Sequence, residues 1–440
     1  MPNPKIFCNS PWYELQIYWD GSFGFCCQAN NKIYSEVNKE QFNIKNMSIS
    51  DWFNSEPMKK IRLAMLGDQP NSICNTCYVY ENYGSTSRRH RANQKSVIFT
   101  KSAFNESYLQ SPHFKNFEYS RINEGLTNNL PIDLHIDLGN YCNLACKMCG
   151  PKASSTIATQ MLKWGIKEVK PYIGTDWTRD QTVWNRTLEE INSFTNLKNI
   201  HFMGGETLIT KRFEDFVDFM IEHNRFNISF SFVTNGTNFN ESLMNKLKLF
   251  NRVGIEISIE TLDEKNSYIR QGTVQSEVIN NINRYKKFTN ETNITLTILP
   301  APSLLSVGTY HNLLRYCLEN NFVVKSLFVI NPNYLDIKIL PKTIKENYLT
   351  NYKKLINDFN LADESTTYDF NESNPNEIRK IIKSEIEHVI NVLETTEPKN
   401  SEERLEKLVY WCKKWDEKYK LNAIEIYPEF SEIFKKYGYL

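Results

Sequence analysis

The chain has 440 residues, of which 40% are hydrophobic and 23% are charged, so it can bury one large core or two to three smaller ones and is not expected to be disordered. Its 52 Lys and Arg against 51 Asp and Glu leave a formal charge of +1, which excludes a general attraction to nucleic acid or to an anionic membrane. The sequence has no run of about 18 apolar residues and no basic start followed by an apolar stretch. We therefore expect a cytoplasmic protein with no membrane partner and no nucleic-acid partner.

Five cysteines lie near the N-terminus: Cys8, Cys26, Cys27, Cys74 and Cys77. The segment "YELQIYWDGSFGFCC" alternates apolar and polar residues around Asp20-Gly21, which predicts a β-hairpin with its turn at that pair. A reducing cytoplasm keeps thiols free, so grouped cysteines there indicate a metal site. Zinc and an iron-sulfur cluster both fit these residues.

A basic run, "GSTSRRHRANQK", occupies residues 84–95. Arg88, Arg89 and Arg91 could hold a phosphate or carboxylate group through paired hydrogen bonds. Most such runs form a solvated helix face, and we favour that interpretation. Residues 98–130 lack clean periodicity and are predicted to link two domains.

Residues 132–330 alternate between strand and helix patterns. This order predicts a parallel sheet with right-handed crossovers, in which ligands gather at the C-terminal ends of the strands. The predicted helices are 185–194, 212–224, 240–250, 276–288 and 310–320, each with apolar residues at spacings of three and four. The predicted strands are 132–138, 198–203, 228–235, 253–260, 293–299 and 324–330.

Three cysteines follow the first of these strands in "LGNYCNLACKMCGPK", with the spacing C-x3-C-x2-C at Cys142, Cys146 and Cys149. A [4Fe-4S] cluster accepts four outer thiolates, so three cysteines leave one iron open. An open coordination position distinguishes a catalytic metal site from a structural one. Clustered cysteines in a reducing cytoplasm indicate a metal site, and three without a fourth nearby leave it one thiolate short.

With this motif, "GGE" at 204–206, "TNG" at 234–236 and "ISIE" at 257–260 end the next three strands. In this order the motifs resemble the radical S-adenosylmethionine (SAM) superfamily over about residues 131–340. The resemblance implies a partial (β/α)6 TIM-like barrel, a [4Fe-4S] cluster whose open iron binds SAM, and reductive cleavage of SAM to a 5′-deoxyadenosyl radical. It also implies SAM contacts from Gly204, Gly205, Glu206, Asn235, Ser258, Glu260, Arg270 and Met148, the last standing where the family commonly has an aromatic residue.

The N-terminal cysteines resemble the SPASM and twitch auxiliary-cluster domains of this superfamily, here placed before the barrel. The resemblance implies that Cys8, Cys26, Cys74 and Cys77 hold a second [4Fe-4S] cluster. Cys27 is the alternate ligand, because neighbouring residues on a strand point to opposite faces. A zinc site remains the alternative for this module.

We therefore expect an α/β fold with four parts. These are a cysteine-rich α+β twitch-like module (1–97), a linker (98–130), the radical SAM barrel (131–342) and a helical C-terminal region (343–440). Cys317 and Cys412 lie in apolar helical patterns and are predicted to be buried and inert.

The favoured function is a radical SAM enzyme that abstracts hydrogen from a peptide or protein side chain and receives electrons from an external donor such as flavodoxin or ferredoxin. A small-molecule substrate such as a sugar or nucleoside is the alternative within this class. A noncatalytic electron-transfer protein with two clusters and a zinc-stabilised binding module are the alternatives outside it. No residue is nominated as a catalytic acid or hydrogen donor.

Overall fold

The computed structural model describes residues 3, 5–29, 40–82, 87–95, 99–100, 103–104, 112–289, 292–364 and 374–439. The chain divides into two compact units that alternate along the sequence. The first comprises residues 1–142, 151–232 and 242–253, and the second comprises 143–150, 233–241 and 254–440. Among the described residues, no helix is long and apolar enough to cross a membrane.

The strands form a mostly parallel sheet in the order β12-β11-β9-β8-β7-β5-β1-β2 and two small two-stranded sheets, β10-β6 and β3-β4. The predicted α/β class is confirmed. In chain order the strands are β1 (Glu14–Ile17), β2 (Phe23–Gly24), β3 (Phe99–Thr100), β4 (Ala103–Phe104), β5 (Asp133–Asp137), β6 (Ala145–Cys146), β7 (Asn199–Met203), β8 (Ser229–Thr234), β9 (Arg252–Ile257), β10 (Arg270–Gln271), β11 (Ile294–Ile298) and β12 (Val323–Val324).

Helices follow the strands in the predicted rhythm, and all five predicted helices of the middle region are present as α8, α9, α10, α12 and α13. In chain order the helices are α1 (Ser10–Tyr13), α2 (Ile49–Phe53), α3 (Glu56–Leu66), α4 (Asn75–Asn82), α5 (Arg88–Lys95), α6 (Pro112–Ile122), α7 (Ser155–Lys163), α8 (Gln181–Ser193), α9 (Lys211–Glu222), α10 (Glu241–Leu247), α11 (Lys265–Ile269), α12 (Gln275–Thr289), α13 (Val307–Asn320), α14 (Lys342–Asp358), α15 (Pro375–Glu394), α16 (Ser401–Tyr419), α17 (Ala423–Ile426) and α18 (Ser431–Lys436).

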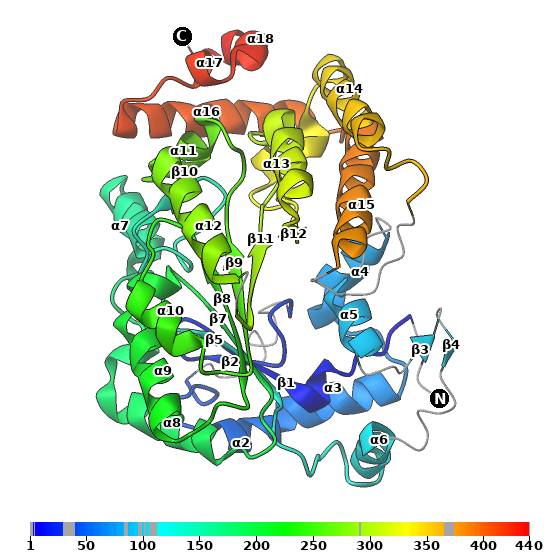
Figure 1. The fold of residues 1–440 in the computed structure, drawn as a ribbon, viewed down its shortest axis with the longest axis vertical. Helices are drawn as coiled ribbons and strands as arrows, with labels where there is room; N and C mark the ends of the chain where they lie inside the picture. The colour runs from blue at the N-terminus through cyan, green and yellow to red at the C-terminus, as the bar shows by residue number, and fades with distance from the viewer. Residues whose placement is uncertain are drawn as a thin grey trace. The chain divides into compact units, whose positions relative to one another are not determined.

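In the first unit, β5, β7 and β8 run parallel, with His135 opposite His201 and His201 opposite Ser231. Alternate residues point to opposite faces of a strand, so the apolar positions between these polar ones share the other face. On that face Phe202 packs against Phe213 and Phe216 of α9, with ring centroids 5.1 and 4.9 Å apart. Figure 1 shows α8 and α9 beside these strands.

The N-terminal hairpin forms as predicted, with β1 antiparallel to β2. Gly21 at its turn has φ +86°, and a Cβ atom there would lie 2.7 Å from Asn43 Oδ1, so both the conformation and the space favour glycine. β1 also pairs in parallel with β5, so the hairpin extends the sheet of the middle region. The sequence did not predict this pairing, because β1 alternates polar and apolar residues like a half-buried strand, whereas all four of its residues are buried.

The predicted linker contains a helix, α6, in its described part, residues 99–100, 103–104 and 112–130. Its apolar residues spread around the helix, which explains why no period was visible. α6 packs against the N-terminal region, since Trp12 Nε1 donates to Ser120 Oγ at 2.8 Å and the Trp12 and Phe117 rings lie 4.6 Å apart. The segment therefore contributes to the core of the first unit.

In the second unit, the prediction of a sixth strand at 324–330 is wrong beyond Val324, because β12 ends at that residue. Beyond it, Leu327 N donates to Pro300 O and Val329 N donates to Pro302 O. Proline has no N–H to donate back, so only half of a ladder can form along this stretch.

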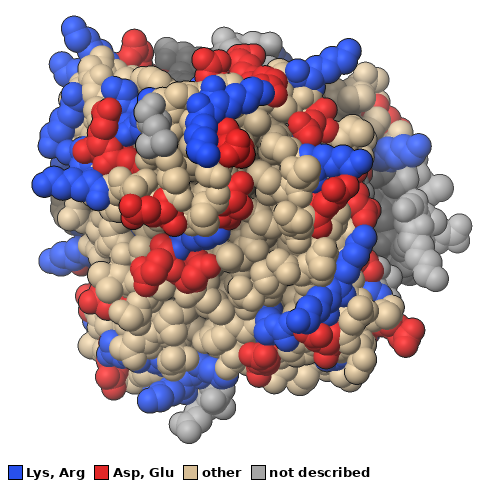
Figure 2. Space-filling model, turned by 90° about the horizontal axis from the view of Figure 1, so that it is seen from above, with Lys and Arg blue, Asp and Glu red and all other residues tan. Residues whose placement is uncertain are grey.

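The C-terminal helices α14 to α18 belong to the second unit and occupy the region 343–440 that was predicted to be helical. On the face shown in Figure 2, Lys and Arg side chains are interspersed with Asp and Glu. This mixed surface agrees with the formal charge of +1.

Candidate functional site

Two of the three cysteines of the C-x3-C-x2-C run lie in the second unit, on a loop fixed by a small antiparallel sheet. Cys146 in β6 pairs with Arg270 in β10. Lys147 N donates to Ile269 O at 2.8 Å, and Cys149 N donates to Cys146 O at 3.1 Å. Cys146 is buried and Cys149 is exposed, so the loop presents one thiol outward and holds the other within the unit.

Arg270 and Glu260 form a buried ion pair beside Cys146. Arg270 Nη1 donates to Glu260 Oε1 at 2.8 Å, and Ala301 N donates to Glu260 Oε2 at 2.6 Å. Burial raises the pKa of Glu260, and the Arg270 cation opposes that rise. A hydrogen bond from Cys149, with a contribution from Arg270, lowers the pKa of Cys146 to about 7 against the effect of burial. The surroundings of Cys146 therefore favour a thiolate, the form that binds metal.

Lys147, between these two cysteines, is held by three aromatic rings. Its Nζ lies 4.9 Å from the ring centroid of Tyr268, 4.6 Å from Trp415 and 4.9 Å from Tyr419. Such contacts stabilise a cation that has been removed from water. Burial nevertheless lowers the pKa of Lys147 to about 7. The cage ties the cysteine loop to α16 within the second unit, and the sequence analysis did not identify Lys147.

Asn235 is tied to the same loop. Asn235 Nδ2 donates to Asn143 Oδ1 at 2.9 Å, and Asn143 Nδ2 donates to Thr237 Oγ1 at 3.0 Å. Ser258 N donates to Thr234 O at 2.9 Å, and the Ser258 side chain is half-buried, as is that of Met148. The strand end that carries Asn235 thus supports the loop directly.

In the first unit, the two glycines of "GGE" pass close to the segment before Cys142. A Cβ atom on Gly204 would lie 2.6 Å from Gly139 O, and one on Gly205 would lie 2.1 Å from Tyr141 O. Their φ values of +86° and +57° also favour glycine. Glu206 N donates to Tyr141 O at 2.8 Å, so this strand end and the cysteine segment are joined through the backbone.

Other contacts in the first unit involve Cys142 and Glu206. Cys142 N donates to Ser155 Oγ at 3.3 Å, and Thr156 Oγ1 donates to Cys142 O at 2.6 Å. Glu206 is buried, and its Oε1 accepts from Leu208 N at 3.1 Å. The Glu206 carboxylate thus caps the short helical turn that follows it.

The N-terminal cysteines meet in the first unit. Cys8, Cys26, Cys74 and Cys77 line one pocket, and Cys27 is not among its lining residues. Burial raises the pKa of the Cys8 thiol to about 12 and raises that of the other three. In the part of the chain described, no group of His, Cys, Asp or Glu residues is arranged around a single metal ion.

Two arginines of the basic run lie at this pocket, so our interpretation of the run as a solvated helix face is wrong for them. Arg89 is buried; its Nε donates to Glu81 Oε1 at 3.0 Å and its Nη1 to Phe7 O at 3.1 Å. Arg88 pairs with Glu14 of β1 at 2.8 Å. Arg89 is drawn inward by Glu81, eight residues before it, and Arg88 by Glu14, which the local sequence does not contain.

Family models match both cysteine regions. The Radical SAM superfamily model matches residues 136–303, and the SPASM model, described as an iron-sulfur cluster-binding domain, matches residues 8–78. Residues 136–303 are therefore a radical SAM domain, and residues 8–78 are a SPASM-type module. The predicted resemblance is confirmed, including the position of the module before the radical SAM domain.

Three solved structures illustrate more distant similarities. They are "Native anSMEcpe with bound AdoMet" (22% identity, 52% of this chain and 62% of that chain covered, TM-score 0.39), Streptococcus suis SuiB bound to precursor peptide SuiA (14%, 69% and 63%, 0.34) and TYW1 with a lysine-pyruvate adduct bound (12%, 56% and 76%, 0.28). The chain covers less than two thirds of the length of the first two. Among curated proteins, none matches it significantly.

The radical SAM match implies a [4Fe-4S] cluster and SAM, and the SPASM match supports an auxiliary cluster. The residues of the module fit an iron-sulfur cluster, because four thiols line one pocket with Arg88 and Arg89 beside them. Thiolates are the ligands that such clusters take. Neighbouring cations offset the cost of holding thiolates away from water.

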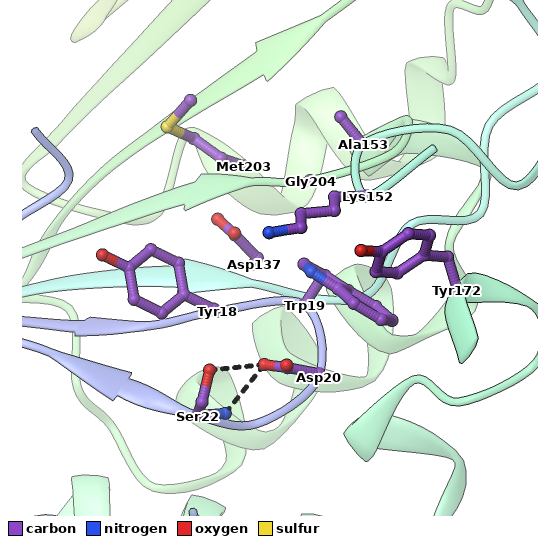
Figure 3. A pocket seen from close by; sticks show the side chains of 10 residues that line it. All are labelled: Tyr18, Trp19, Asp20, Ser22, Asp137, Lys152, Ala153, Tyr172, Met203 and Gly204. Atoms are coloured by element: carbon purple, nitrogen blue, oxygen red, sulfur yellow. Dashed lines mark hydrogen bonds between the residues drawn. The ribbon is translucent and has the colours of Figure 1, made fainter. Parts of the chain in front are cut away.

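A second pocket of the first unit, of about 280 Å³, lies beside the strand end that carries Gly204 (Figure 3). No sequence pattern indicates it, because its walls come from the hairpin, the ends of β5 and β7, one loop and the 3-10 helix Lys167–Tyr172. Its lining residues are Tyr18, Trp19, Asp20, Ser22, Asp137, Lys152, Ala153, Tyr172, Met203 and Gly204.

Asp137, in this pocket, is expected to make folding stability depend on pH. Burial and the neighbouring Asp20 raise its pKa to about 7, although Gln16 Nε2 donates to it at 3.1 Å. A carboxyl group with a raised folded-state pKa stabilises the fold when protonated, so this stability is lost as pH rises from about 4 to about 7. As the pH rises from 5.5 to 8, the free energy of unfolding of Asp137→Asn, measured with urea, should increase by about 2 kcal/mol relative to that of the parent chain. A constant difference across this range would contradict the assignment.

Proposed function

We propose that the chain is a radical SAM enzyme that abstracts a hydrogen atom from a side chain of a peptide or protein. The observation that carries this proposal is the match of residues 136–303 to the superfamily model, with Cys142, Cys146 and Cys149 at the family spacing. When bound, the cluster and SAM supply a 5′-deoxyadenosyl radical. The three cysteines would hold that cluster.

The residues around Cys146 support this assignment. Arg270 favours the thiolate form of Cys146, and Glu260 fixes the guanidinium of Arg270 through an ion pair of 2.8 Å. We assign both as positioning residues. Gly204, Gly205, Glu206, Asn235, Ser258 and Met148 are proposed to form the surroundings of SAM.

A peptide substrate is supported by the SPASM-type module, because modules of this type accompany many peptide-modifying members of the superfamily. The same module would hold the auxiliary cluster through Cys8, Cys26, Cys74 and Cys77. We propose a one-electron donor such as flavodoxin or ferredoxin. We also propose a cytoplasmic location, since a reducing compartment keeps the ten cysteines available for ligation.

The test is anaerobic. The protein is purified and reconstituted, iron and sulfide are counted, and 5′-deoxyadenosine is measured after reduction in the presence of SAM. About eight irons per chain with 5′-deoxyadenosine formed are expected, four for each cluster. Absence of both iron and 5′-deoxyadenosine would overturn the proposal, whereas iron without cleavage would favour a noncatalytic electron-transfer protein.

The auxiliary cluster can be tested separately. Replacing Cys74 and Cys77 together by alanine should lower the iron content from about eight to about four per chain, because the module loses two of its four ligands. Cys27→Ala is the matched control and should retain about eight irons. Loss of iron in the control, with retention in the double variant, would show that the ligands have been assigned wrongly.

A further inference from the structure

The pocket that contains Asp137 suggests a more specific substrate class. We propose that it binds the ammonium or guanidinium group of a lysine or arginine side chain presented by the peptide substrate. That the bound peptide is a substrate rests on the proposed function, but its binding can be measured without any reaction. Asp20 and Asp137 would contact the cation, and Trp19 and Tyr172 would contact its carbon chain.

Above pH 7, where Asp137 is ionised, the charged side chains of the pocket leave it one cation short. Two carboxylates, Asp20 and Asp137, and one amine, Lys152, line it. Among the described side chains, Lys152 makes no ion pair with either carboxylate. Figure 3 shows the Asp20 carboxylate turned toward Ser22. A carboxylate withdrawn from water is costly unless a cation or several donors accompany it. A cationic ligand would supply the missing partner.

Both carboxylates are held in place before any ligand arrives. Asp20 Oδ1 accepts from Ser22 N at 3.0 Å and from Ser22 Oγ at 2.5 Å. Asp137 Oδ1 accepts from Gln16 Nε2 at 3.1 Å. A site whose charged groups are already oriented loses little conformational entropy when it binds. These bonds therefore distinguish a built site from two flexible surface acids.

The walls also favour a cation. Trp19 and Tyr172 meet edge to face with ring centroids 5.5 Å apart, and Figure 3 shows both rings beside the opening. Lys152 Nζ already lies 5.9 Å from the Tyr172 ring centroid, so this ring accepts a cation in the present structure. Aromatic faces attract ammonium and guanidinium groups. A carboxylate pair beside such rings selects cations over neutral polar groups.

The size and position of the pocket fit a single side chain. Its volume of about 280 Å³ is just below the range of about 300 to 1,000 Å³ typical of pockets for whole small molecules. Gly204 lines the pocket and also belongs to the "GGE" motif, which we assign to the surroundings of SAM. A lysine or arginine bound here would therefore anchor a peptide next to that motif.

Binding can be tested with blocked amino acids on the full-length reconstituted protein. N-acetyl-arginine amide and N-acetyl-lysine amide are titrated by saturation-transfer NMR, with the neutral isostere N-acetyl-citrulline amide as the comparison. We expect at least one cation to bind roughly tenfold or more tightly than citrulline. Asp137→Asn and Asp20→Asn should each weaken cation binding by about tenfold. Glu189→Gln, an exposed change on α8, should leave it unchanged.

Several results would overturn the proposal. These are equal binding of citrulline and arginine, no binding of either cation by the parent chain, or unchanged affinity in both aspartate variants. Circular dichroism establishes that each variant is folded, and the second aspartate keeps the test decisive if one variant is not. Because no SAM is consumed, failure to form 5′-deoxyadenosine would reject the proposed function and leave the binding result intact.

Discussion

Replacing Cys146 by alanine is expected to abolish SAM cleavage and to lower the iron content from about eight to about four per chain. Cys146 is the buried member of the three-cysteine run, and its pKa is lowered to about 7 in the second unit. Alanine supplies no ligand, so the cluster would keep only two thiolates. Anaerobic iron analysis and chromatography of 5′-deoxyadenosine measure both effects.

Cys317→Ala is the matched control for this change. Cys317 is also buried, lies on α13, and is far in sequence from both cysteine clusters. Burial raises the pKa of its thiol, as expected for an inert core cysteine. The control should retain the iron and the cleavage activity. Normal cleavage by Cys146→Ala, or loss of iron in Cys317→Ala alone, would contradict the assignment of the catalytic cluster.

Local sequence patterns were sufficient to predict strands that bury one face. The segments 132–138, 198–203 and 228–235 alternate apolar and polar residues, and each forms a strand that differs from the prediction by at most one residue at either end. The same principle failed at 324–330. There the residues are apolar enough for a strand, but Pro300 and Pro302 opposite them cannot donate to a ladder. A strand depends on its partner as well as on its own composition.

Interactions between distant residues could not be predicted from the sequence. The basic run resembles a solvated face, but Glu14, more than 70 positions away, draws Arg88 inward. The pocket at Asp137 likewise depends on the pairing of β1 with β5, which joins residues more than 100 positions apart. Family motifs identified the cysteines because the residues of a motif lie close together in the sequence. The residues that form the walls of this pocket do not.

The ion pair of Glu260 and Arg270 could not be predicted from local sequence patterns either. Its removal is expected to have the largest effect on the free energy of unfolding. The Glu260 side chain is fully buried, and that of Arg270 is about 10% exposed. Both Glu260 oxygens are engaged, one by Arg270 and one by the backbone of Ala301. Removing one member of such a pair leaves a buried charge and an N–H without a partner. The assignment of Glu260 as a SAM contact stays a prediction, and its neighbours in the second unit also make it a support for Arg270.

Glu260→Ala should therefore lower the free energy of unfolding by about 3 to 5 kcal/mol. Glu256→Ala is the matched control, because Glu256 pairs with Lys325 at 3.2 Å in a more exposed setting and should cost about 1 kcal/mol or less. Combining Glu260→Ala with Arg270→Met should recover part of the loss, since the unpaired cation is then absent. Urea unfolding of the four chains under anaerobic conditions provides the comparison. Equal losses of unfolding free energy in Glu260→Ala and Glu256→Ala would mean that the buried pair adds nothing beyond a surface contact. A larger loss in the double variant than in Glu260→Ala would mean that an unpaired Arg270 cation is not the cause of the loss.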